Sequence, residues 1–152
     1  MLKAQSGFSY FLFFLRRLPT LAFWNIGVPL LNENICTVSV KYNWFTKNPF
    51  RSVYFAALSG AAELSTGLLI FYHLKNKKNV SYLVTKVEGE FFKKAKGRIS
   101  FTCPDGPLVS DALKRLDREN PSSVLAMHTE GYDANGVQVA RFTFTWSFKI
   151  KL

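Results

Sequence analysis

The spacing of hydrophobic and polar residues changes several times along the chain, and the least polar stretch lies at residues 53–75. Nine of the twelve residues from 56 to 67 are Ala, Gly, Ser or Thr, and Glu63 is the one charged residue before Lys75. A segment that is small and apolar on all sides has no wet face, which is typical of a helix enclosed by the rest of the fold. We therefore predict a buried central helix of about 22 residues, about 33 Å long.

Alternation of apolar and polar residues predicts several β-strands around this helix. The last strand is the most regular, since large aromatic residues occupy one face while Arg, Thr, Ser and Lys occupy the other. Asp133 to Gly136 forms a hairpin turn between the last two strands. Lys93 to Gly97 also has the composition of a turn, so we expect the strands on either side of it to pair with each other. The expected strands are residues 35–42, 80–92, 98–103, 124–132 and 137–150.

Two further helices are predicted away from the centre. Residues 6–17 have helical spacing, and a short helical or irregular segment follows them. Apolar residues recur at helical spacing from Val109 to Leu116, and Asn120-Pro121 ends that helix. Ser52 precedes the central helix and is expected to cap its first turn.

These elements predict an α+β fold in which an antiparallel sheet of about five strands curls around the central helix. The apolar faces of the strands need a partner, and the small residues of the helix allow them to approach closely. Residues 1–25 are expected to form an N-terminal helical segment that packs on the domain, and residues 26–152 form the domain itself. The chain of 152 residues suits one domain, and no linker divides it.

The charge of the chain narrows its possible partners. A net charge of +10, from 20 Lys and Arg against 10 Asp and Glu, predicts attraction to polyanions. An anionic membrane or a phosphorylated cofactor fits this charge, and so does a merely basic, solvated surface. Nucleic acid is not expected, because residues 137–150 place aromatic and basic side chains on opposite faces instead of interleaving them.

The two cysteines, Cys36 and Cys103, exclude one further class of site. Neither has a metal-ligand neighbour at CxxC spacing, so no metal site is expected. Both are expected to remain reduced thiols, which favours a cytoplasmic protein.

Two apolar stretches have some of the features of membrane segments. The run from Gly7 to Leu15 is too short to span a bilayer, which takes about 20 residues, and the Arg16-Arg17-Leu18-Pro19 that follows is not a signal-peptide cleavage site. A docking helix is expected there, with peripheral membrane contact as the alternative. The stretch from Phe55 to Tyr72 is long enough for a span, but Glu63 at its middle would be unfavourable there by about 3 kcal/mol.

In this order of elements the chain resembles the hot-dog fold, a curved sheet wrapped around a central helix. Its residues resemble those of the phenylacetate-degradation-type acyl-CoA thioesterases and of the related hot-dog domains of unknown function. Those proteins carry an Asn in the loop before the helix, a His-Gly-Gly-like helix start, and an acid about two and a half turns further on. The corresponding residues here are Asn48, Tyr54-Phe55-Ala56 and Ala61-Ala62-Glu63, so Tyr54 stands in the place of the His. The resemblance extends from Ile26 to the C-terminus.

The resemblance implies a role for each of these residues. Glu63 would be the catalytic base or nucleophile, and burial should raise its pKa toward that of a useful base. N–H groups near Tyr54 and Phe55 would hold the oxyanion at the positive end of the helix dipole. Asn48, Tyr54, Phe55 and Thr66 would contact the substrate. The alternative is a structural carboxyl group that stays neutral or bonds to a neighbouring hydroxyl or main-chain group.

Basic residues near the turn at 93–97 add a candidate phosphate site. Coenzyme A carries a pyrophosphate and a phosphorylated adenosine, so cationic rims are expected on proteins that bind it. A solvated turn is the simpler interpretation. Coenzyme A would be part of the substrate, and no separate cofactor is expected. The candidate residues are Lys93, Lys94, Lys96 and Arg98.

The sequence therefore predicts a hydrolase of acyl-CoA or acyl-carrier-protein thioesters. The resemblance implies a homodimer or a dimer of dimers with the site at the subunit boundary, and the long strand edges, which need cover, favour pairing independently. The alternative is a non-catalytic protein on the same scaffold that binds an acyl or lipid ligand or has a regulatory role. In that case Glu63 would be structural.

Overall fold

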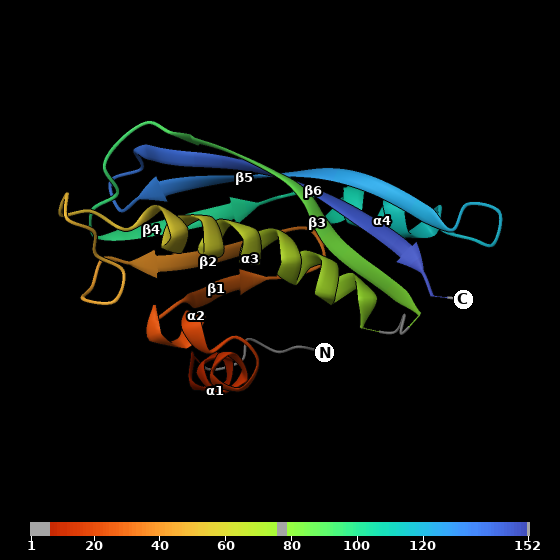
Figure 1. Ribbon diagram of the computed structural model, residues 1–152, viewed down its shortest axis with the longest axis horizontal. Helices are drawn as coiled ribbons and strands as arrows, with labels where there is room; N and C mark the ends of the chain where they lie inside the picture. The colour runs from red at the N-terminus through yellow and green to blue at the C-terminus, as the bar shows by residue number, and fades with distance from the viewer. Residues whose placement is uncertain (1–6, 76–78, 152) are drawn as a thin grey trace.

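The computed structural model describes residues 7–75 and 79–151, and these residues form one antiparallel sheet of six strands with four helices. The strand order across the sheet is β1-β2-β4-β5-β6-β3 (Figure 1). The helices are α1 (Gly7–Arg17), α2 (Pro19–Phe23), α3 (Phe55–Leu74) and α4 (Gly106–Lys114). The strands are β1 (Gly27–Leu31), β2 (Cys36–Lys41), β3 (Val80–Phe91), β4 (Arg98–Cys103), β5 (Ser122–Asp133) and β6 (Gln138–Ile150).

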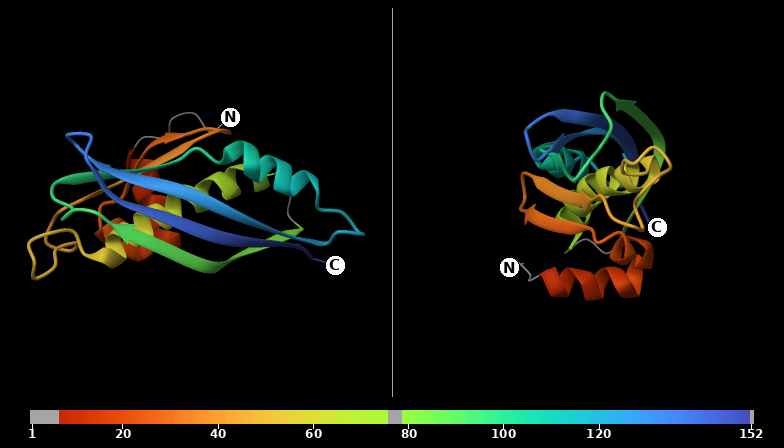
Figure 2. Two further views of the ribbon diagram at one scale, coloured as in Figure 1. Left: turned by 90° about the horizontal axis from the view of Figure 1, so that it is seen from above. Right: turned by 90° about the vertical axis from the view of Figure 1, so that its left-hand side faces the viewer.

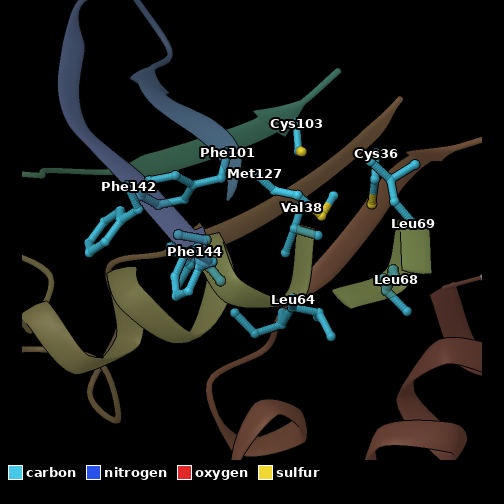
Figure 3. Packing of buried hydrophobic residues seen from close by; sticks show 14 of the residues in the cluster. Cys36, Val38, Leu64, Leu68, Leu69, Phe101, Cys103, Met127, Phe142 and Phe144 are labelled. Carbon is cyan, nitrogen blue, oxygen red and sulfur yellow. The ribbon is translucent and has the colours of Figure 1, made fainter. Parts of the chain in front are cut away.

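The sheet curves around α3, as the two views of Figure 2 show. Leu69 and Ile70 of the helix are fully buried, and Figure 3 shows Val38 of β2 and Phe144 of β6 pointing toward it. Full burial of one such side chain contributes about 1.5–3 kcal/mol, so the packing of α3 against the sheet stabilises the fold. The predicted α+β architecture, with a curved antiparallel sheet around a long helix, is confirmed.

Two polar contacts fix α3 within the sheet. Ser65 Oγ is hydrogen-bonded to Thr129 Oγ1 of β5 at 2.8 Å. Trp146 Nε1 of β6 donates to Thr66 Oγ1 at 3.0 Å. All four side chains are buried, and an unpaired polar group there would be unfavourable by about 1–3 kcal/mol. These bonds therefore set the rotation of the helix about its own axis.

The strands on either side of residues 93–97 do not pair as expected. β3 lies at the edge of the sheet beside β6, whereas β4 lies between β2 and β5. The connection crosses the end of the sheet, where the Ala95 carbonyl accepts from Val53 N–H at 2.9 Å. β6 pairs with β3 from one end to the other, whereas β4 has only six residues. The predicted hairpin is therefore wrong, because a longer aromatic strand further along the chain is the better partner.

The start of α3 also differs from expectation. The helix begins at Phe55, with Tyr54 at the N-cap position and no side-chain cap. Ser52, the expected cap, donates from Oγ to Asn48 Oδ1 at 3.2 Å within the preceding loop. The prediction of a Ser52 cap is wrong, and the first turn of α3 keeps main-chain N–H groups that no side chain satisfies.

Two other elements were missed or displaced. β1 has only five residues and contains Pro29, so it lacks the alternation that marks a strand, and it lies at a sheet edge, where Pro is tolerated. α4 begins at Gly106 instead of at Val109. A Cβ atom at Gly106 would lie 2.0 Å from the Glu33 carbonyl oxygen, so this helix start requires glycine.

The segment that contains α1 and α2 lies outside the sheet, next to β1 (Figure 1). Phe14 is fully buried, the Phe13 ring lies 6.4 Å from that of Phe71, and Trp24 lies over Gly60 of α3. These contacts attach the N-terminal helices to α3. Helix α3 is itself long and apolar enough to cross a membrane, but it packs inside the sheet, as core helices with the same composition do.

Candidate functional site

One stripe of α3 is only partly covered by the sheet. Eleven of the twenty helix residues are buried, but along one side Phe55 is 58% exposed and Phe71 is 44% exposed. Glu63 lies midway between them and is only partly buried. The prediction that the helix is enclosed on every side is therefore wrong along this stripe. It leaves a side from which a ligand or a second chain can reach the carboxyl group. The open stripe consists of Phe55, Ser59, Glu63, Gly67 and Phe71.

Three residues that the sequence analysis did not single out surround Glu63. A Cβ atom at Gly67 would lie 3.4 Å from Glu63 Oε1 and 3.6 Å from Trp146 Cη2, so the missing side chain leaves room for both groups. The Tyr82 ring lies 5.8 Å from that of Trp146. Burial, and then the charge of Glu63, raise the pKa of Tyr82. The spacing of Gly67, four residues after Glu63, was the one sequence signal for this neighbourhood.

The carboxyl group of Glu63 has no hydrogen-bond or ion-pair partner among the residues that the structure describes. Among the described residues, every fully buried side-chain oxygen has a hydrogen-bond partner. The unpaired carboxyl oxygens of Glu63 are therefore not fully buried and keep some contact with solvent. Burial nevertheless raises the pKa of Glu63 above its ordinary value of 4.5, because the charged form loses hydration. This is the direction expected from the sequence. An acid that holds its proton more tightly is also a stronger base once ionised.

Thr66 supports the site from inside the helix. Its Oγ1 donates to the Glu63 main-chain carbonyl at 2.8 Å and accepts from Trp146 Nε1 at 3.0 Å. The hydroxyl thus bonds the main chain of Glu63 and not its carboxyl group. A direct contact between Thr66 and a substrate stays a prediction.

A pocket of about 330 Å³ lies at the N-terminal end of α3 and brings together four of the candidate binding residues. Asn48 and Phe55 line it from the loop before the helix and from the helix start, and Lys93 and Lys94 line it from the connection after β3. Lys96 and Arg98 do not line this pocket. Two cations, an amide and an aromatic wall therefore converge where the helix dipole is positive.

Asn48 has a defined role in shaping this pocket. Its Oδ1 accepts hydrogen bonds from Phe50 N–H at 3.0 Å and from Ser52 N–H at 3.1 Å. These bonds fold the loop into a turn. The side-chain amide nitrogen makes no hydrogen bond within the described residues, so it is free to donate to a ligand in the pocket.

The main-chain N–H groups at the start of α3 divide into used and free donors. The N–H of Tyr54 donates to the Thr46 carbonyl at 2.7 Å, so the expectation that it serves an oxyanion is wrong. Those of Phe55 and Ala56 have no acceptor among the described residues. Tyr54 itself is 46% exposed, and its ring packs edge-on against Phe55 with centroids 5.2 Å apart.

The pocket and Glu63 are separate within one chain. Glu63 lies eight positions after Phe55 in the helix, which at helical rise is about 12 Å. One thioester carbonyl therefore cannot contact the free N–H groups and the carboxyl group of the same copy. The outer edge of β3 is unpaired in the described structure, and Leu83 and Val87 on it are exposed.

The histidines make structural contacts. His73 Nε2 lies 2.9 Å from the Glu33 carbonyl. The main-chain N–H of His128 donates to Asp105 Oδ2 at 2.7 Å, and His128 Nδ1 lies 3.6 Å from the same oxygen. Within the described residues no group of three or more His, Cys, Asp or Glu side chains is placed to hold a metal ion.

Comparison with known families identifies the domain. A family model described as a domain of unknown function, DUF4442, matches residues 8–148. The chain belongs to the DUF4442 family. A comparison of this DUF4442 chain with curated proteins finds no significant match.

Solved structures with the same architecture as this DUF4442 domain come from several bacteria. PA5026 from Pseudomonas aeruginosa, a probable thioesterase of unknown function, superimposes with a TM-score of 0.80 at 17% identity over 90% of each chain. A protein of unknown function from Chlorobaculum tepidum reaches 0.77 at 13% identity, over 96% of this chain and 94% of its own. Thioesterase HI1161 from Haemophilus influenzae reaches 0.71 at 11% identity, over 99% and 94%. The DUF4442 domain thus has the hot-dog fold.

Proposed function

We propose that this DUF4442 protein hydrolyses acyl thioesters, with Glu63 as the general base or nucleophile. The observation that carries the proposal is the unpaired, partly buried carboxyl group of Glu63 on the open stripe of α3, with a raised pKa. Its hot-dog neighbour HI1161 is described as a thioesterase and PA5026 as a probable thioesterase, which supports the same reaction class for this chain.

The proposed chemistry uses both ends of the open stripe. The Glu63 carboxylate removes a proton from a water molecule whose oxygen attacks the thioester carbonyl, or it attacks that carbonyl itself to form a mixed anhydride that water then hydrolyses. Negative charge develops on the carbonyl oxygen in both cases. The free N–H groups of Phe55 and Ala56 stabilise that oxygen, since they point outward at the positive end of α3. The C–S bond then breaks as the carbonyl re-forms, and the carrier leaves as a thiolate that takes up a proton from Glu63 or from water. Because these groups lie about 12 Å apart in one copy, the complete site requires two copies.

We therefore expect a homodimer formed through the exposed edge of β3. A two-fold axis beside this edge reverses the direction of the partner's α3 relative to the first. The N-terminal end of one helix then faces the later part of the other, where Glu63 lies. The unpaired strand edge and the exposed Leu83 and Val87 support this arrangement. A dimer of dimers would use further surfaces.

The pocket at the start of α3 suits the carrier end of the substrate. Lys93 and Lys94 line this pocket, and in this proposal they bind phosphate oxygens of coenzyme A or of the phosphopantetheine on an acyl-carrier protein. The free amide of Asn48 can donate to an amide carbonyl of the pantetheine arm, and Phe55 offers an apolar wall. Lys96 and Arg98 would extend the basic rim outside the pocket.

Hydrolysis of acyl-CoA substrates of several chain lengths tests the proposal directly. Glu63→Gln keeps the shape of the side chain but removes the base, and loss of a general base lowers kcat by about 10²–10⁴-fold. Glu119→Gln, which alters an exposed acid in the loop after α4, is the matched control and should retain full activity. Equal turnover by Glu63→Gln and the unmodified protein, or no turnover by either, would overturn the assignment.

The alternative function is binding of an acyl ligand without hydrolysis. It is favoured by the start of α3, where Tyr54 and the 58% exposed Phe55 place two bulky rings beside the free N–H groups. A protein of this kind would bind acyl-CoA with unchanged affinity in Glu63→Gln and release no thiol. The same assay, combined with calorimetric titration of a non-hydrolysable thioether analogue, separates the two functions.

A further inference from the structure

A cluster of exposed aromatic side chains lies on the loop between β2 and α3 and on the adjoining α2. Trp44 is 72% exposed, Phe50 70%, Phe23 57% and Phe45 56%. The Phe45 ring contacts Phe23 at 5.8 Å and Trp44 at 5.3 Å between centroids. Transfer of these side chains out of water into an apolar environment is favourable. A gathering of this kind marks an interaction site more often than chance exposure. We call Phe23, Trp44, Phe45 and Phe50 the aromatic cluster.

The segment that carries Phe23 also exposes a row of leucines, two on α1 and one directly after it. Leu12, Leu15 and Leu18 are each more than two-fifths exposed, and their spacing of three residues places them on one side of the segment. Phe14, which points the other way, is fully buried. The loop is attached to the same segment, because Asn43 Nδ2 donates to the Trp24 carbonyl at 3.4 Å. Figure 1 shows α1 and α2 at the outside of the domain.

The charge of this surface has one sign. Residues 12–25 and 43–51 contain four basic residues and no Asp or Glu. The Lys47 ammonium lies 5.2 Å from the centre of the Trp44 ring, and no salt bridge is formed by any of the four cations within the described residues. Tryptophan and phenylalanine interleaved with Arg and Lys are the residues that settle at the boundary between lipid headgroups and acyl chains. The four cations are Arg16, Arg17, Lys47 and Arg51.

From these observations we infer that the aromatic cluster, the leucine row and the four cations form a docking surface for an anionic lipid membrane. The apolar side chains enter the headgroup region and the cations pair with lipid phosphates and carboxylates. A second copy of this chain is a poor occupant, because a two-fold contact would place the four cations against the same four cations. An acidic protein would match the charge but would have to cover the protruding rings as well. An anionic lipid membrane matches both features of this surface: its acyl chains accept the aromatic cluster, and its headgroups neutralise the four cations.

Docking in this orientation has a consequence for the pocket at the start of α3. Asn48 lines that pocket and lies between Trp44 and Phe50 in the same loop. A membrane that holds the loop would therefore lie beside the pocket. The inference itself concerns binding to lipid and does not depend on whether the protein hydrolyses thioesters.

Sedimentation with phospholipid vesicles tests the inference on the full chain. Vesicles of phosphatidylcholine mixed with phosphatidylserine should bind the protein, and vesicles of phosphatidylcholine alone should bind it at least tenfold more weakly. The triple variant Trp44→Ser, Phe45→Ser, Phe50→Ser should lose binding. Val124→Ser, which changes an exposed apolar side chain on β5, is the matched control and should bind normally.

The charge arm of the test removes cations one at a time. Each Lys or Arg near an anionic membrane contributes about 1 kcal/mol, so each change to Gln should weaken binding about fivefold. Lys149→Gln on β6, away from this surface, should have no effect. Raising the salt concentration should weaken binding of the unmodified protein and have less effect on a variant that lacks all four cations. The four changes are Arg16→Gln, Arg17→Gln, Lys47→Gln and Arg51→Gln.

A spectroscopic readout does not depend on any destabilised variant. Trp44 is the exposed tryptophan, whereas Trp146 is buried and Trp24 is partly buried. Brominated phospholipids should therefore quench the fluorescence of the unmodified protein but not that of Trp44→Phe. Absence of quenching, equal binding to neutral and anionic vesicles, or binding that survives the triple variant would overturn the inference. So would self-association or capture of an acidic carrier protein through this surface without any binding to lipid.

Discussion

The hydrogen bond between Trp146 and Thr66 ties the sheet to the helix at the point where Glu63 sits, and Thr66→Val removes it without changing the volume of the side chain. Thr66 is fully buried, and its Oγ1 is the hydrogen-bond acceptor for the Trp146 indole N–H, 3.0 Å away. Valine leaves that N–H buried without a partner, which is unfavourable by about 1–3 kcal/mol. Thr and Val have similar helix propensity, so a change in helix propensity contributes little to the loss of stability in Thr66→Val.

The expected loss of about 2 kcal/mol converts to a melting temperature lower by about 4–8 °C for a domain of this size. Thr66→Ser is the matched control. It keeps the hydroxyl group and removes one methyl group, which accounts for about 0.8 kcal/mol. Calorimetry and denaturant unfolding of both variants measure the difference. If Thr66→Val is as stable as the unmodified protein, or more stable than Thr66→Ser, the assignment of this bond as a stabilising contact is refuted.

The same change should alter the titration of Glu63. Trp146 is no longer held beside the carboxyl group in Thr66→Val, so water gains access to it. The pKa of Glu63 then falls toward its ordinary value of 4.5, because burial is what raises it. Under the proposed function the acid limb of the pH–rate profile moves to lower pH. A purely structural role for Thr66 would lower stability and leave the profile in place.

Glu63→Gln should be more stable than the unmodified protein at neutral pH. The pKa of Glu63 is higher in the folded state than in the unfolded state, so folding is coupled to uptake of a proton. The free energy of unfolding of the unmodified protein therefore falls as pH rises from 4.5 through the raised pKa. The advantage of Gln should vanish below pH 4.5 and reach a plateau at neutral pH in a series of denaturant unfolding curves; a variant less stable at neutral pH would contradict this. Leu83→Lys with Val87→Lys on β3 should give a monomer by light scattering and lose any hydrolytic activity with it. Gly106→Ala should lower stability by several kcal/mol in thermal unfolding, because its Cβ would lie 2.0 Å from the Glu33 carbonyl oxygen.

Local patterns were sufficient for the parts of the fold that depend on neighbouring residues. The run of small residues from 56 to 67 identified α3, and the one-sided aromatic pattern of β6 identified the strand that covers it. The pairing of β3 could not be predicted in this way, since its partner residues lie 49 to 70 positions further along the chain. The turn-like Lys93 to Gly97 indicated a nearer partner. Which strand lies beside which is decided by total burial in the sheet, and a local pattern does not report it.

The candidate site shows the same division. Glu63 could be identified because a lone acid in an apolar helix is conspicuous. Tyr82 and Trp146 could not, because they meet Glu63 only after β3 has paired with β6. The roles of Ser52 and the Tyr54 N–H were assigned wrongly for a related reason. The loop before α3 folds around Asn48 and uses up these groups in its own turn.

The position of β6 between β5 and β3 also determines when the molecule can fold. The ribosome synthesises α3 and β3 long before β6, so in a growing chain the apolar helix α3 is exposed until β6 has emerged. Assembly must be a late, concerted event near the end of translation, with many contacts between distant residues, and it should be slow. Nascent chains halted before residue 138 should therefore bind chaperones or aggregate. Chains that include the final strand should fold and be released from the chaperones.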